Sequence, residues 1–175
     1  MEMYGVVIIN IESEQDIQNL QNKIDEMSEE HSGNKFDFEK VKHNSTQALL
    51  QFMSDSSGSM VLDDLFAYFA EENLPFAKAS IIGDEDPFIN LYWIDNGDYY
   101  QSNIESSRYE YLSEADEDEL DEDDLAFLSN PKKTILEDYK LWKKGIVVIE
   151  SFNEINSIVG DVIDSVIEDC ESMVE

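Results

Sequence analysis

Residues 4–10 constrain the fold more than any other part of the sequence, because they read Tyr-Gly-Val-Val-Ile-Ile-Asn. A short β-branched run without polar alternation predicts a strand that is covered on both faces. Residues 145–149 form a similar run, Gly-Ile-Val-Val-Ile, and a helical pattern follows each run. The likeness fits a duplicated strand–helix unit or, as we favour for such short strings, convergence on a common pattern. Either origin predicts a covered sheet with helices packed against it.

Several segments carry apolar residues at spacings of three and four, the pattern of amphipathic helices. Ser13 with Asp16, and Ser151 with Glu154, have the spacing of a capping box at a helix start. Asn130 followed by Pro131 places a capping residue and a proline in their favoured positions. The predicted helices are residues 13–30, 46–53, 61–73, 130–144 and 151–170.

Asn96 and Gly97 give the clearest turn in the chain, because both residues accept the positive φ of a type I′ hairpin turn. The runs on either side of this turn therefore predict a β-meander over residues 76–104. The predicted fold is α+β, with a mixed or mainly antiparallel sheet of five to seven strands and helices packed on it, all within a single domain of residues 1–175. The remaining strands are expected at residues 35–43, 76–82, 88–94 and 99–104, with an edge strand at 109–112.

Acidic residues dominate the surface that this chain can form. Residues 114–124 hold nine carboxylates in eleven positions, and the whole chain carries 41 acidic and 11 basic residues, a formal net charge of −30. Like charges at this density repel one another and cannot be buried, so we expect a solvated acidic loop at residues 113–129. Hydrophobic residues make up 42% of the chain and aromatic residues 11%, which is the composition of a folded protein rather than of a disordered acidic tail.

The sequence offers little to an enzyme. Cys170 is the single cysteine and His31 and His43 are the only histidines, so no zinc-ligand spacing exists. No glycine-rich phosphate loop or nucleophile elbow is present, and Leu120 stands at the fifth position of the one stretch that begins like an EF-hand loop. We expect no catalytic site, no bound metal and no cofactor. The two histidines are interpreted as surface residues and Cys170 as part of a buried helix face.

The charge also limits the partners. A polyanion is repelled by nucleic acid and by anionic membrane surfaces, and no apolar stretch has the roughly 18 residues that a membrane span needs. We therefore expect a cytoplasmic protein that binds neither nucleic acid nor membrane. A globule of this length is about 40 Å across, and a DNA duplex of that length carries on the order of 24 phosphates, a density similar to that of this chain.

These features predict a non-enzymatic inhibitor that mimics DNA and binds the basic nucleic-acid-binding surface of a nuclease or other defence enzyme. In overall charge and size the chain is similar to phage anti-restriction proteins that mimic DNA, although it contains no motif that we can match to theirs. The predicted contact surface consists of Asp84, Glu85, Asp86, Asp95, Asp98, Glu114, Asp116, Glu117, Asp118, Glu119, Asp121, Glu122, Asp123 and Asp124.

Two other functions remain open at this stage. An immunity protein or antitoxin that neutralises one cognate nuclease toxin would depend on a few central aromatic and acidic residues. A scaffold or solubility module would use its charge only for solvation. Homodimerisation through the apolar last helix also stays open. Tyrosines in and after the hairpin would be interface anchors or half-buried sheet residues, and the five lysines of residues 132–144 would fold back on the acidic run or leave one less acidic face.

Overall fold

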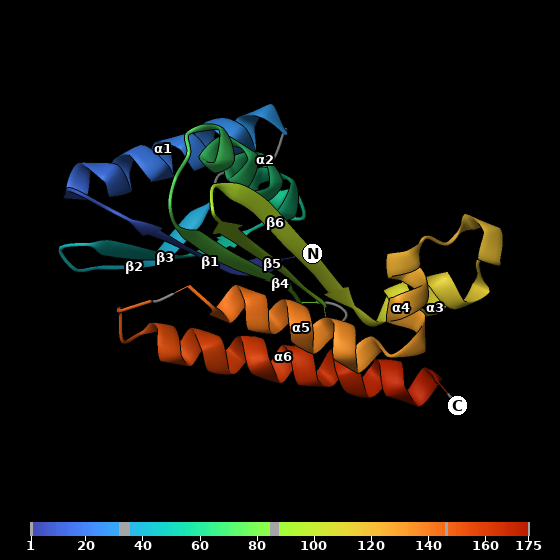
Figure 1. The fold of residues 1–175 in the computed structure, drawn as a ribbon. Coiled ribbons are helices and arrows are strands. Elements are labelled where there is room, and N and C mark those ends of the chain that lie inside the picture. The colour runs from blue at the N-terminus through green and yellow to red at the C-terminus, as the bar shows by residue number, and fades with distance from the viewer. Residues whose placement is uncertain (1, 32–35, 85–87, 146, 175) are drawn as a thin grey trace.

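The protein has three layers, with a β-sheet between two pairs of helices (Figure 1). A computed structural model describes residues 2–31, 36–84, 88–145 and 147–174. Helices α1 and α2 cover one face of the sheet and α5 and α6 cover the other, while α3 and α4 project at one side. The elements are β1 (Met3–Asn10), α1 (Glu14–Glu30), β2 (Asp37–His43), β3 (Gln47–Ser54), α2 (Gly58–Glu71), β4 (Ala77–Gly83), β5 (Phe88–Asp95), β6 (Asp98–Glu105), α3 (Ser106–Glu114), the 3-10 helix η1 (Glu117–Glu119), α4 (Glu122–Ser129), α5 (Pro131–Lys143) and α6 (Phe152–Met173).

The sheet has six strands in the order β2-β3-β1-β4-β5-β6, and every neighbouring pair is antiparallel. This confirms the predicted α+β fold with five to seven strands. In the central strand β1 the adjacent residues Val6 and Val7 point to opposite faces of the sheet. They are 1% and 0% exposed, so both faces of β1 are covered as predicted. The covering comes from two separate apolar cores, one on each side of the sheet.

The core on the α1–α2 side contains the predicted helical stripes. Ile17, Leu20 and Ile24 of α1 are buried there, and Leu65 and Phe66 of α2 pack with them. Helix α1 begins as predicted, because the Asp16 carboxylate accepts hydrogen bonds from the backbone N–H groups of Ser13 and Glu12. The core on the opposite side is built by sheet residues such as Leu49 and Leu91 together with the inner faces of α5 and α6.

The β-meander and its turn are confirmed. Asn96 has φ 53° and Gly97 has φ 80°, the positive values that a type I′ turn requires. Strands β5 and β6 then pair over their full length, from Asp95 opposite Asp98 to Phe88 opposite Glu105.

The helix predicted at residues 46–53 is wrong, because this segment is strand β3. Ala48, Leu49, Leu50 and Phe52 are all buried, since β3 lies between β1 and β2 and both of its faces are covered. An apolar run of this length fits either period, and the pairing with β1 on one side and β2 on the other selects the strand.

The edge strand predicted at residues 109–112 is also wrong, because the segment belongs to α3. Tyr109 and Leu112 lie three residues apart, which puts both on one side of a helix. There they pack in the core on the α5–α6 side of the sheet. The sheet itself ends at β6.

The described part of residues 145–149 is not a strand, and Ile146 lies outside the described residues. The backbone N–H of Val148 donates to the side chain of Gln47 over 2.9 Å, so this segment is held by a side chain rather than by a sheet ladder. The resemblance to residues 4–10 does not extend to structure. Ser151 has φ −60° and ψ −16°, a helical backbone conformation in which the predicted capping box of α6 does not form.

Helix α5 begins and ends where the sequence predicts. The Asn130 side chain accepts the backbone N–H of Lys133 over 3.2 Å, and Pro131 occupies the first turn. Trp142 is fully buried and donates its indole N–H to the carbonyl oxygen of Ala79 in β4 over 2.9 Å. The bond fixes the C-terminal end of α5 directly on the sheet.

Lys78 makes a second connection between β4 and this end of α5. It is 1% exposed, and its Nζ donates to the carbonyl oxygen of Gly145 over 2.8 Å. The rings of Phe76, Trp142 and Phe152 lie 5.1–5.9 Å from Nζ, so aromatic faces and the negative end of a helix surround the ammonium group. Among the described residues Lys78 has no carboxylate partner, and burial lowers the pKa of its amine to about 8.

This environment predicts a distinct pH dependence of stability. Between the folded pKa of about 8 and the ordinary value of 10.5, the unfolded chain binds a proton that the folded chain has released, so the free energy of unfolding rises with pH. Relative to Lys78→Met, we expect the wild type to gain about 3 kcal/mol from about pH 7.5 to about pH 10.5. Urea unfolding of both proteins at intermediate pH values measures this difference. Parallel pH profiles would show that Lys78 titrates normally in the folded state.

Candidate functional site

The acidic segment forms an arm, which we define as α3, η1 and α4, and which projects from the body of the protein (Figure 1). The solvated loop expected at residues 113–129 is thus largely helical, although most of its side chains are exposed to solvent as expected. Helix formation follows from the positions of the acids. Asp121 caps α4 by accepting the backbone N–H of Asp124 over 2.8 Å, and three carboxylates occupy the first turn, where the helix dipole favours negative charge.

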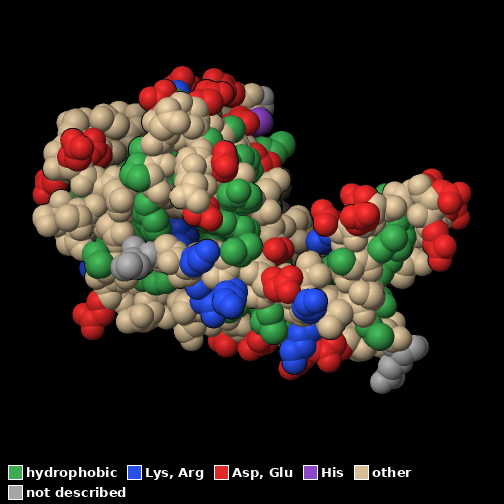
Figure 2. All heavy atoms as spheres, in the orientation of Figure 1, with side chains coloured by type: hydrophobic (Ala, Val, Ile, Leu, Met, Phe, Trp, Pro, Cys, Tyr) green, Lys and Arg blue, Asp and Glu red, His purple; other side chains and the backbone are tan. Residues whose placement is uncertain are grey.

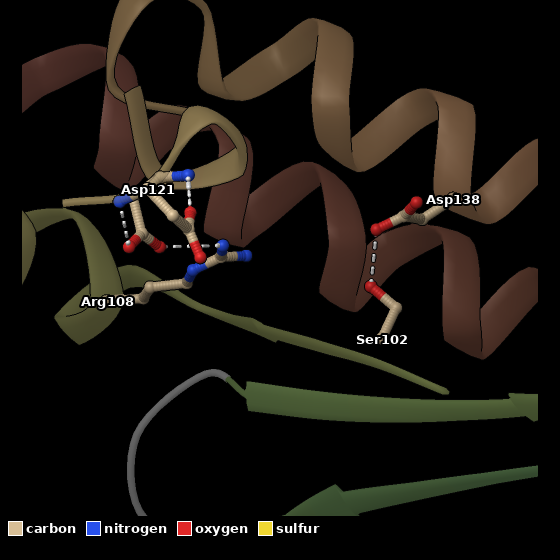
Figure 3. Close-up of polar contacts among 5 residues, drawn as sticks. Ser102, Arg108, Asp121 and Asp138 are labelled. Carbon is tan, nitrogen blue, oxygen red and sulfur yellow. Dashed lines mark hydrogen bonds and ion pairs between the residues drawn. The ribbon is translucent and has the colours of Figure 1, made fainter. Parts of the chain in front are cut away.

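Arg108, the only arginine of the chain, joins the two helices of the arm. Its guanidinium carbon lies 4.3 Å from the centre of the Phe127 ring, and one guanidinium nitrogen lies 3.7 Å from a carboxylate oxygen of Asp124. Figure 3 shows Arg108 reaching from the start of α3 to the capping box at Asp121. A planar cation that stacks on a ring and faces a carboxylate suits arginine better than lysine. Nothing in the local sequence pattern singled out this residue.

A small apolar cluster supports the same junction. Phe127 is 1% exposed and Leu112 is 7% exposed, and the ring of Tyr109 lies 6.3 Å from that of Phe127. These side chains belong to the core on the α5–α6 side, so α3 and α4 are packed on the body at their base. The carboxylates beyond this base are therefore carried by ordered helices and not by a free chain.

The structure brings together only some of the predicted contact residues. The arm groups Glu114, Asp116, Glu117, Asp118, Glu119, Asp121, Glu122, Asp123 and Asp124, all of which are exposed except Asp124, which is half-buried against Arg108. Asp84 is exposed at the end of β4 and accepts the backbone N–H of Glu2 over 3.1 Å. Glu85 and Asp86 lie outside the described residues.

Asp95 and Asp98 are exposed but lie away from the arm. They close the β5–β6 turn, whereas α3 starts at the other end of β6, after Glu105. The eight residues of β6 separate these two positions by roughly 23 Å. Asp95 and Asp98 therefore do not form one continuous patch with residues 114–124.

Two large apolar side chains stand among the carboxylates of the arm. Tyr111 is 74% exposed and Leu125 is 47% exposed. Of the other tyrosines in and after the β5–β6 hairpin, Tyr92 is 0% exposed, whereas Tyr100 is 44% exposed. Tyr111 is thus the most exposed of the tyrosines considered as interface anchors.

The lysines of residues 132–144 leave one face less acidic. Lys132, Lys133, Lys140, Lys143 and Lys144 are all exposed, and none of the ion pairs within the described ranges connects them to the arm. Figure 2 shows Lys and Arg side chains gathered over the α5 side of this view, and Asp and Glu side chains on the arm, at the α1–α2 end and along the lower edge beside the lysines.

Two carboxyl groups next to the sheet have altered acidity. Burial raises the pKa of Asp138, and its carboxylate accepts a hydrogen bond from the Ser102 hydroxyl over 2.7 Å (Figure 3). Burial also raises the pKa of Asp63, beside Tyr92 and Tyr99. Asp138 contacts a serine hydroxyl, but the two histidines contact other carboxylates: His31 pairs with Asp64, and His43 lies 3.6 Å from Glu14.

The described residues contain no group of three or more histidine, cysteine, aspartate or glutamate side chains arranged to hold a metal ion. Within those same residues no helix has the length and apolar character of a membrane span. Comparison with family models, curated proteins and solved structures gave no match.

The role of Arg108 in fixing the arm can be tested by limited proteolysis. A glutamate-specific protease has cleavage sites throughout residues 114–122, and cleavage requires local opening. Loss of the ring contact and the ion pair in Arg108→Met should increase cleavage about fivefold, equivalent to about 1 kcal/mol, with a smaller increase in Arg108→Lys. Equal cleavage of all three proteins would mean that the apolar cluster alone holds the arm.

Proposed function

We propose that this protein is a non-enzymatic inhibitor that occupies the basic nucleic-acid-binding surface of a nuclease or another defence enzyme by mimicking DNA. The observation that carries the proposal is the arm, in which carboxylates are concentrated on ordered helices that project from the body. A basic cleft that accepts nucleic acid can receive such a projection without rearrangement of the protein's core.

The spacing of charge supports this interpretation. Consecutive residues of an α-helix advance about 1.5 Å along its axis, and a DNA duplex carries one phosphate per roughly 1.7 Å. Asp121, Glu122, Asp123 and Asp124 are consecutive acids at the start of α4. Their charge per unit length therefore matches that of the duplex, although the helix distributes the charges around its own axis.

The distribution of the cations also supports an oriented interaction. The exposed lysines of α5 would repel a basic surface, whereas the arm contains only Arg108, which already faces Asp124. A basic partner is therefore attracted most strongly to the arm side.

The proposal predicts a charge effect that depends on position. The arm variant Asp116→Asn, Glu117→Gln, Asp118→Asn, Glu119→Gln removes four exposed charges that take no part in the capping box at Asp121. A matched control removes four exposed charges from the α1–α2 end, with Glu29→Gln, Glu30→Gln, Glu71→Gln and Glu72→Gln. Loss of attraction should weaken binding of a captured partner at least about tenfold for the arm variant and less than about threefold for the control.

The measurement begins with a pull-down from bacterial lysate, eluted along a salt gradient. Capture of nucleic-acid enzymes that both salt and duplex DNA displace would support mimicry, and the two variants would then be compared on the captured enzyme. If no basic protein is retained at low salt, or if the two variants lose affinity equally, the arm is not the binding surface and mimicry by it is rejected.

The exposure of Tyr111 favours a second candidate function, an immunity protein or antitoxin for one nuclease toxin. Tyrosine is enriched among the few residues that carry most of the binding energy at tight, specific interfaces. On this hypothesis Tyr111→Ala should weaken binding by at least about 2 kcal/mol, and the complex should survive high salt. Under mimicry Tyr111→Ala should change the affinity little. A titration by calorimetry at low and high salt distinguishes the two.

A further inference from the structure

Strand β6 is an open edge of the sheet. It is the last strand in the order, and its eight residues pair with β5 without a bulge. Between Asp98 and Glu105 it reads Tyr-Tyr-Gln-Ser-Asn-Ile, with no charged residue, proline or glycine. A long, regular and uncharged edge strand is a template for pairing with another strand.

The turn geometry identifies the backbone groups on the open side. Asp95 and Asp98 close a two-residue hairpin and form a hydrogen-bonded pair, and such pairs alternate along an antiparallel ladder. The N–H and C=O groups of Tyr99, Gln101 and Asn103 therefore point away from β5. In residues 2–31, 36–84, 88–145 and 147–174, no backbone or side-chain hydrogen bond reaches these backbone groups. Gln101 and Asn103 are also exposed.

The other edge of the sheet is protected. Strand β2 shifts its register between Asp37 and Lys40, and exposed charged side chains, among them Glu39 and Lys42, line it. Bulges and charges are the features that prevent strand addition. Of the two edge strands, only β6 has neither a bulge nor a charged side chain between its end residues.

Acidic groups lie on both sides of the β6 edge. The carboxylates of Asp63 and Asp64 contribute to raising the pKa of Tyr99, after the larger effect of its burial. Asp138 contacts Ser102 on the opposite face of the strand, and Asp98 and Glu105 mark its two ends. A second copy of the chain would bring another net charge of −30 to this edge. A basic segment would be attracted by the carboxylates around β6, although the exposed lysines of α5 lie on the same side of the sheet as Asp138.

We propose that β6 is a docking edge for an extended, lysine- or arginine-containing segment of a partner protein, which adds to the sheet as a seventh, antiparallel strand. Tyr100 provides a further contact, because it is 44% exposed and its ring is stacked on Trp93 with 5.8 Å between centroids. A basic side chain opposite Tyr100 can lie over this ring pair. The inference concerns β6 alone and holds whether or not the arm mimics DNA.

The probe for this edge is an acetylated and amidated heptapeptide of alternating lysine and valine. Its control is a peptoid with the same side chains, which has the same charge but no backbone N–H and cannot form a ladder. We expect the peptide to bind at least about tenfold more tightly than the peptoid and to slow amide hydrogen exchange at Tyr99, Gln101 and Asn103. Equal binding of the peptide and the peptoid, or no protection of these amides from hydrogen exchange, would mean that charge attraction alone explains the binding. Either result would overturn the proposal.

Two substitutions at one position complete the test. Gln101→Pro removes an outward N–H that the sheet does not use, and Gln101→Thr keeps it while losing the same side-chain contact with Tyr99. Peptide affinity should fall at least about tenfold in the proline variant and change less than about twofold in the threonine variant. An unchanged affinity in Gln101→Pro overturns the proposal. So does self-association of the wild type that Gln101→Pro abolishes, because the occupant would then be a second copy.

Discussion

The structure depends on covering both faces of its central strands. Adjacent residues of β1 and of β3 are both buried, so each strand contributes to two cores at once. One helix layer cannot bury both faces, and the chain therefore places α1 and α2 on one side and α5 and α6 on the other. The same requirement determines where the charge lies. Carboxylates excluded from two cores must occupy the outer faces of the helices, the turns and the arm.

The sequence predicted elements whose local pattern and tertiary environment agree. The Asn96–Gly97 turn, the capping box of α1 and the start of α5 at Asn130 each have a chemistry with one favoured structure. The predictions were wrong where the structure depends on which strands lie beside a segment, because the local sequence pattern does not contain that information. Residues 46–53 became a strand because β1 and β2 flank them, and residues 147–149 lie outside the sheet although their composition resembles that of β1. Pairing partners far apart in sequence decide such cases.

The candidate site shows the same difference between properties that follow from the local sequence and properties that depend on distant contacts. Exposure of residues 114–124 followed from charge alone, because no fold can bury nine carboxylates in eleven positions. Their placement on a projecting arm did not follow, since it depends on Arg108 lying over Phe127 nineteen positions away and on α3 packing beside α6. Asp95 and Asp98 carry the same charge but lie at the opposite end of β6, so charge by itself could not assign them to a patch.

The few cations explain why the charge on the arm remains available to a partner. Lys78 is buried against the end of α5, Arg108 is held between Phe127 and Asp124, and the lysines of α5 are exposed on their own helix. No basic residue is left among residues 114–124 to neutralise the acids there. A positively charged surface that approaches from the α5 side meets lysines first, and one that approaches the arm meets carboxylates. On the proposed function, this separation of attraction and repulsion would orient a basic partner more firmly than a uniformly acidic surface could.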